Sequence, residues 1–231
     1  MLSNEILLRL QEGRKPNPNS PKKIIYFVGP PACGKTTKIQ TLKNKFGGYY
    51  QYITLDGYPS IWEYETNFFF RNLVDLLTIS ERLVNAIQTA TKTHQNTIFV
   101  DGHPILSVLK CESVYRVYNS KNITEKQLSI IYDIYKEIVD YINTNKIFKD
   151  FQQYIYYINF PLEENLRLLQ KKESCKEISE DMKTELVTFR RKIHSDIFKL
   201  TDQFKGTRVI EVNTIPSLEI IHMYLLGSSG C

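Results

Sequence analysis

The stretch that decides the fold of this 231-residue chain is Gly-Pro-Pro-Ala-Cys-Gly-Lys-Thr, at residues 29–36. It matches the pattern GxxxxGK[ST], in which glycines let successive backbone N–H groups turn toward phosphate oxygens. An apolar run, residues 24–28, precedes it, and a segment with helical spacing, residues 36–46, follows it. This strand-loop-helix order makes a phosphate-binding loop a better explanation than a glycine-rich turn that binds nothing.

The loop supplies the candidate ligands for a donor nucleotide. Lys35 would reach the β- and γ-phosphates, and Thr36 would bind Mg²⁺. A thiol inside a tight turn is explained by its small size, so no catalytic role is assigned to it. The residues predicted to contact the nucleotide are Gly29, Pro30, Ala32, Cys33, Gly34, Lys35, Thr36 and Thr37.

The composition is that of a soluble globular protein. Hydrophobic residues make up 42% of the chain and charged residues 24%, which excludes wholesale disorder. No apolar run approaches the length of about 18 residues that a membrane span needs, so we expect no membrane partner. The net charge of +5 favours anionic partners weakly and is too dispersed to predict a nucleic-acid surface. Four cysteines without CxxC spacing predict reduced thiols in the cytoplasm.

Apolar runs alternate with segments of helical spacing along the rest of the chain. Beside residues 24–28, four short runs read as buried strands: 52–55, 97–100, 154–158 and 209–212. Longer helical segments lie between or after them, at 61–93, 124–145, 162–172 and 178–204. This alternation predicts an α/β fold with a five-stranded parallel sheet, whose ligands bind beyond the carboxyl ends of the strands.

The domain organisation predicted from the sequence is simple. Residues 1–21 are expected to form a short amphipathic helix and a proline-rich linker, without the features of a secretory signal. Residues 22–226 form one domain, and residues 227–231 have the composition of a flexible tail.

Two carboxylates follow the second and third predicted strands, Asp56 and Asp101. A carboxylate at a strand end beside a phosphate loop can hold Mg²⁺ or accept the proton of an attacking hydroxyl. Asp101 follows the short run Thr-Ile-Phe-Val at residues 97–100, which favours the metal role. Each acid is also followed by glycine, so a capped turn is the alternative for both.

The remaining landmarks favour a phosphotransferase that acts on a small substrate. The chain has no guanine-reading motif and is short for a helicase core. After Asp56, a helical face formed by Tyr64, Phe68, Arg71 and Asp75 suits the stacking and hydrogen bonding of a nucleobase. A surface pair of Arg71 and Asp75 beside half-buried aromatic rings is an equally good explanation of that spacing.

The order of these motifs resembles the deoxynucleoside kinases, close relatives of the thymidylate kinases. The resemblance rests on the phosphate loop, Asp56, Trp62, the run Phe-Arg-Asn-Leu-Val at residues 70–74, and a Pro-Leu-Glu-Glu-Asn-Leu-Arg turn at residues 161–167. It spans roughly residues 22–226. It implies a three-layer fold of the P-loop NTPase type with a helical lid, ATP and Mg²⁺ as cofactors, and transfer of the γ-phosphate to the 5′-hydroxyl of a nucleoside.

The resemblance also implies roles for individual residues. Asp56 would act as general base for the acceptor hydroxyl, and Asp101 with Thr36 would hold the metal. Acceptor binding would involve Asp56, Trp62, Phe70, Arg71 and His103. Lys35, Asp101 and Arg167 would join Asp56 in catalysis, and Lys171 and Lys172 of the lid would contact the donor. A homodimer through the long helices is implied as well.

Three departures from the family pattern leave alternatives open. An aspartate stands at position 56 where the family has glutamate, and Arg71 stands where a base-reading glutamine is expected. An arginine on this helix resembles the thymidylate kinases, whose acceptor already carries a phosphate. A nucleoside monophosphate is therefore the alternative acceptor. The arginine that normally follows the acid is missing from Asp101-Gly102-His103. A non-catalytic, nucleotide-binding regulatory protein is therefore a further alternative. A histidine in a turn is more often structural than catalytic.

Overall fold

The computed structural model describes residues 21–30, 32–46, 50–54, 67–117, 123–171 and 207–213, and residues 181, 184, 187, 188, 191 and 192. Its five strands form one sheet in the order β2-β3-β1-β4-β5, with every pair parallel. The predicted five-stranded parallel sheet is therefore confirmed. The strands are β1 (Lys22–Val28), β2 (Gln51–Ile53), β3 (Thr97–Asp101), β4 (Phe151–Ile158) and β5 (Arg208–Val212).

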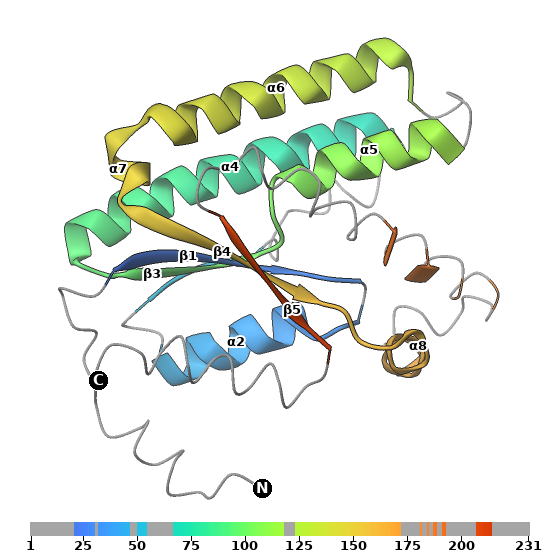
Figure 1. The fold of residues 1–231 in the computed structure, drawn as a ribbon, viewed down its shortest axis with the longest axis horizontal. Helices are drawn as coiled ribbons and strands as arrows, with labels where there is room; N and C mark the ends of the chain where they lie inside the picture. Colours follow the sequence, from blue (N-terminus) through green and yellow to red (C-terminus); the bar gives the residue numbers. More distant parts are fainter. Residues whose placement is uncertain are drawn as a thin grey trace, which may run out of the picture.

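Helices cover both faces of this sheet, which gives the predicted three-layer α/β architecture (Figure 1). On one face lie α4 (Phe68–Thr93), α5 (Ile105–Val117) and α6 (Glu125–Thr144), and on the other lies α2 (Lys35–Phe46). The short α7 (Lys146–Lys149) connects α6 to β4, and α8 (Leu162–Gln170) follows β4. Residues 181, 184, 187, 188, 191 and 192, farther along the chain, are helical too.

The central strand β1 shows why helices cover both faces of the sheet. Its side chains alternate between two apolar cores, as the two-residue period of a strand requires. Tyr26 and its neighbours on the same face pack in the core formed with α4, α5 and α6, whereas Phe27 packs with Ile39 of α2. All residues from Ile24 to Val28 are essentially buried. A continuous apolar run is therefore the expected sequence of this strand.

Aromatic rings form a row across the α2 side of the sheet. Phe99 stacks on Tyr52 at 5.6 Å between ring centroids and on Phe27 at 6.2 Å, and Phe27 stacks on Tyr156 at 5.7 Å. The four rings come from four neighbouring strands, β2, β3, β1 and β4. Offset stacking of this kind stabilises the rings beyond the burial of their area. The row therefore helps to hold together β1, which precedes the phosphate loop, and β3, which carries Asp101.

Helix α4 begins later than the pattern predicts. Asn67 is extended (φ −80°, ψ 106°), and its side-chain oxygen accepts a hydrogen bond from the backbone N–H of Phe70. Because asparagine is a strong N-cap, the helix starts at Phe68 and not at residue 61. Residues 55–66 lie outside the described part of the chain.

The other predicted helices agree with the structure where it describes them. Thr124 and Gln127 form a capping box at the start of α6, close to the predicted boundary. Among the described helices, none combines the length and the apolar character that crossing a membrane requires. The predicted N-terminal helix, the linker through Ser20 and the tail at residues 227–231 lie outside the described residues.

Candidate functional site

The phosphate loop joins the carboxyl end of β1 to α2. Lys35, the first residue of α2, turns its side chain back over the loop: its Nζ donates to the carbonyl oxygens of Gly29 (2.9 Å) and Pro30 (2.8 Å). The same ammonium lies 3.4 Å from the Cys33 sulfur. Since α2 begins at this point, a positive side chain and the N-terminus of a helix converge on the loop.

Steric limits fix the shape of the loop. A Cβ on Gly29 would lie 2.7 Å from the carbonyl oxygen of Ile158 on β4 and 2.8 Å from the Cys33 sulfur, so only glycine fits there. Ala32 and Gly34 both have positive φ (59° and 85°). Such left-handed residues let backbone N–H groups point toward one side, the arrangement that binds anions in phosphate loops.

Asp101 meets the loop from the neighbouring strand. It ends β3, opposite Phe27 in the β1 register, and its Oδ2 accepts a hydrogen bond of 2.6 Å from the hydroxyl of Thr36. Two oxygen groups that Mg²⁺ prefers therefore meet at the start of α2, where Thr36 follows Lys35. This donor set fits the predicted metal role of Thr36 and Asp101.

The protein provides only part of a metal shell at this place. Among the described residues, no group of three or more His, Cys, Asp or Glu side chains could hold a metal ion. Mg²⁺ usually takes one or two protein ligands and completes its octahedron with water and substrate phosphates. A hydroxyl and one carboxylate beside a phosphate loop suit that mode of binding.

His103 lies close by in sequence but faces the core. It is completely buried, its ring meets that of Tyr26 at 4.4 Å, and its Nδ1 accepts a hydrogen bond from the backbone N–H of Ile105 at the start of α5. Burial lowers the pKa of His103 to about 3, so the ring is neutral at physiological pH. In this structure His103 caps α5 and is shielded from a substrate, as the structural explanation of a turn histidine expects.

The first turn of α4 carries two of the predicted acceptor ligands. Phe70 is 54% exposed, with its ring edge against Phe69, and Arg71 is also exposed. The neighbouring Asn72 is buried and donates to the carbonyl of Phe68, so it points away from solvent. Asp75 forms an ion pair of 3.9 Å with Lys110 of α5.

The other acceptor residues and part of the lid lie outside the described residues: Asp56, Trp62 and Lys172. The structure does show how the chain is held just before Asp56. Arg82 of α4 donates from its guanidinium to the carbonyl oxygen of Thr54, which follows β2. No local pattern in the sequence predicts this contact, because its two partners lie 28 residues apart.

Comparisons with known proteins give a likeness of structure without a likeness of sequence. No protein family and no curated protein matches the sequence. Among solved structures, deoxyadenosine kinase from M. mycoides with bound dATP superposes with a TM-score of 0.54 at 16% identity, over 87% of this chain and 98% of that one. The same enzyme with the products dCMP and a flexible dCDP gives a TM-score of 0.56, with the same identity and coverage. The chain has the deoxynucleoside kinase fold.

The deoxynucleoside kinase fold confirms the family resemblance at the level of architecture. At 16% identity, the sequence likeness to that enzyme is confined to short motifs. The predicted lid helix is α8, which follows β4 directly. Its Arg167 is half exposed, and its Nε and Nη2 donate to the carboxylate of Glu164 on the same helix, at 2.7 and 2.5 Å. Lys171 is exposed at the C-terminal end of α8.

A second arginine anchors the lid segment. Arg191 donates to the carbonyl of Phe160 and, at 3.2 Å, to the side-chain oxygen of the buried Asn165 in α8. Nearby, Leu169 of α8 and Val187 are buried together, with Ala32 of the phosphate loop packed against them. The lid segment of this deoxynucleoside kinase fold is thus connected to the phosphate loop through apolar packing and held to the β4–α8 turn by Arg191.

Proposed function

We propose that the protein is an ATP-dependent phosphotransferase that adds the γ-phosphate of ATP to the 5′-hydroxyl of a nucleoside. The observation that carries this proposal is the hydrogen bond between Thr36 and Asp101, with Lys35 on the same phosphate loop, within a deoxynucleoside kinase fold. Nucleotides are present in the structures of the M. mycoides enzyme with this fold, which supports nucleotide binding by this chain.

The chemistry divides among these groups. The loop amides and Lys35 would bind the phosphates of ATP, and Thr36 with Asp101 would hold Mg²⁺, which supplies positive charge against the phosphate oxygens. The acceptor oxygen bonds to the γ-phosphorus as the bond to the β-phosphate oxygen breaks, and ADP leaves. We propose that Asp56 takes the proton of the acceptor hydroxyl. Arg167 and Lys171 are the described lid cations that could neutralise the transferring group.

A nucleoside monophosphate is the second candidate acceptor. The exposed guanidinium of Arg71 in the first turn of α4 favours it, because a planar guanidinium binds phosphate in a bidentate manner. We further propose a small-molecule acceptor for a homodimeric enzyme of the cytoplasm. The subunit number is checked by light scattering of the purified chain.

The test is an assay of ATP and Mg²⁺ against two panels, the nucleosides and the nucleoside monophosphates, with products identified by chromatography. We expect phosphorylation of at least one nucleoside and loss of that activity in Lys35→Ala. The matched control is Lys43→Ala, on the exposed face of α2. If only monophosphates react, the second candidate replaces the first. If ATP binds but neither panel reacts, the protein is a non-catalytic nucleotide-binding protein.

A further inference from the structure

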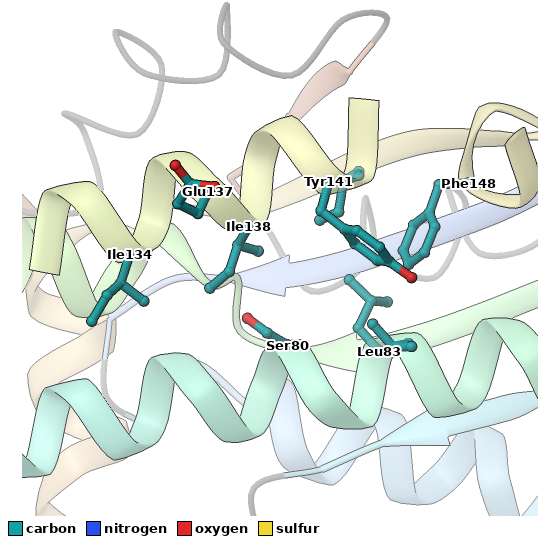
Figure 2. A pocket seen from close by; sticks show the side chains of 9 residues that line it. Ser80, Leu83, Ile134, Glu137, Ile138, Tyr141 and Phe148 are labelled. Atoms are coloured by element: carbon teal, nitrogen blue, oxygen red, sulfur yellow. The ribbon is translucent and has the colours of Figure 1, made fainter. Parts of the chain in front are cut away.

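The apolar side chains of α8 have a different neighbour from those of the long helices. Between α4 and α6 lies a pocket of about 290 Å³ with apolar lining residues such as Ile138 and Phe148, which the proposed homodimer would cover (Figure 2). On α8, by contrast, the buried Leu169 packs with the buried Val187, and Ala32 packs against this pair. The apolar side of α8 therefore contacts the phosphate loop.

The backbone of Ala32 is left-handed, with φ 59°. A residue with a side chain is strained in this region, whereas glycine adopts it freely. The loop has glycine at positions 29 and 34, yet it has alanine at position 32, where glycine would be easier. Strained residues are concentrated at functional sites. The methyl of Ala32 packs against the apolar side of α8, and this contact offsets the strain.

Helix α8 pairs with later helical residues through one polar and one apolar contact. In the polar contact, Arg191 donates at 3.2 Å to the side-chain oxygen of Asn165, and in the apolar contact Leu169 meets Val187. Side chains four residues apart share a face of a helix, so both contacts lie on one face of α8. The lower number on α8 meets the higher number on the other side, which makes the pairing antiparallel.

The polar contact is anchored to the sheet. Arg191 also donates to the carbonyl of Phe160, just after β4, and Asn165 is completely buried. Burial raises the pKa of Tyr157 on β4, the Arg191 guanidinium lowers that pKa, and Cys33 of the phosphate loop raises it. Arg191 and Cys33 therefore lie near the same side chain, so this anchor and the phosphate loop are neighbours.

The apolar contact lies at the C-terminal end of α8, where the lid cations are. Leu169 stands between Arg167 and Lys171 in the sequence, two residues from each. We propose that Ala32 is a positioning residue, whose methyl holds this end of α8 against the phosphate loop so that the lid cations stand at the phosphates of bound ATP. The inference rests on the proposed function, because it takes the loop as the donor site and α8 as the lid.

Hydrogen exchange in the full chain tests this link without any need for phosphotransfer. ATP with Mg²⁺, at concentrations that saturate each variant by calorimetry, should slow exchange of the Leu169 amide about fivefold or more in the wild type. Ala32→Gly keeps the left-handed backbone and removes the methyl, so the slowing should disappear. The matched control is His94→Gly, because His94 is also left-handed (φ 56°) but lies at the C-cap of α4. It should keep the slowing.

Two outcomes of the exchange experiment overturn the proposal. The first is a wild-type chain in which exchange at Leu169 does not respond to ATP, whether or not any nucleoside is phosphorylated. The second is loss of ATP binding by Ala32→Gly, since Ala32 would then act on the loop itself and not through α8. Failure to phosphorylate a nucleoside or a monophosphate contradicts the proposed function alone and leaves the exchange result standing.

Kinetics with the acceptor found in the panel assay add a second measurement. Ala32→Gly should lower kcat about 10-fold, while the Kd for ATP stays close to that of the wild type. Leu169→Ala should have the same effect, and the double variant should be no slower than either single variant. Leu169→Met keeps most of the volume and should retain most of kcat. Losses that multiply in the double variant overturn the proposal, because Ala32 and α8 then act independently.

Discussion

The hydroxyl of Thr36 donates a hydrogen bond of 2.6 Å to the carboxylate of Asp101, although 65 residues separate them. The contact exists because β1 and β3 are neighbours in the sheet, so the loop after one strand meets the last residue of the other. If the two groups share a Mg²⁺ ion, Asp101→Asn should lower kcat about 100-fold and raise the Mg²⁺ concentration needed for half-maximal activity.

Thr36→Ser is the matched control for Asp101→Asn, because it keeps the hydroxyl. It should retain most of the activity in a titration of Mg²⁺ under saturating ATP. An Asp101→Asn enzyme with the Mg²⁺ dependence of the wild type would show that the contact is a structural hydrogen bond only.

Gly29 is confined by two neighbours, so Gly29→Ala should lower the free energy of unfolding by about 1–3 kcal/mol through overpacking. Part of that cost comes from the Cys33 sulfur at 2.8 Å and part from the Ile158 carbonyl. The cost measured by denaturant unfolding should therefore shrink in a Cys33→Ala background. Gly34→Ala is the comparison: no atom lies within 4 Å of its added Cβ, so its cost should not depend on position 33.

Burial of His103 gives the fold a predictable response to acid. Its folded pKa of about 3 lies below the value of roughly 6.5 expected for an unfolded chain, so only the unfolded state takes up the proton between these values. This residue should remove about 1.4 kcal/mol of stability for each pH unit below about 6. His103→Asn keeps an acceptor for the Ile105 N–H, so it should flatten the slope of unfolding free energy against pH from 6 to 4.

The control for this slope is His94→Asn, since His94 is an exposed histidine in the left-handed C-cap of α4, where asparagine is well tolerated. Equal slopes in the two variants would show that acid sensitivity does not come from His103.

Arg82 holds the carbonyl of Thr54, two residues before the proposed general base. Arg82→Gln should lower kcat roughly 10- to 100-fold, because a small misplacement of a catalytic group is costly, while the Kd for ATP stays close to that of the wild type. Arg116→Gln, an exposed arginine that pairs with Glu112 on α5, is the control. Equal losses of activity in the two variants would contradict a positioning role for Arg82.

The strands were predictable because each contains a short run rich in apolar, β-branched or aromatic residues. Residues 24–28 are buried on both faces of the sheet, so they carry no polar alternation, and turn residues bound them clearly. The order of the strands was not predictable from these runs. The strand order depends on which strands pair, and this pairing involves residues far apart in the sequence, such as Phe27 and Asp101.

Helix α5 escaped prediction for a physical reason. Residues 105–109 are all buried, and so is Cys111, because the helix lies between the sheet, α4 and α6. A helix covered on most sides lacks the amphipathic period by which helices are recognised in a sequence. The start of α4 was placed too early because the aromatic spacing continues before Asn67, and only the cap marks the boundary.

The candidate site likewise contains residues that the sequence predicts and contacts that it does not. The loop residues and Asp101 were predictable, because a local motif and a strand end define them. Contacts between distant segments were not: the Arg82–Thr54 hydrogen bond and the hold of Arg191 on Asn165 follow from tertiary packing alone. His103 follows an acid in a turn, as a catalytic residue would, and only its burial reveals that it caps α5.

Strand β1 has a neighbour on each side, β3 and β4, whereas β2 and β5 end the sheet as the structure describes it. Amide hydrogens in the middle of a sheet exchange only when much of the molecule opens, and those at its margins exchange through smaller openings. The phosphate loop is therefore attached to the part of the sheet that opens last. Asp56, the proposed general base, comes soon after the marginal strand β2, so the proposed acceptor site can open while the proposed donor site stays closed.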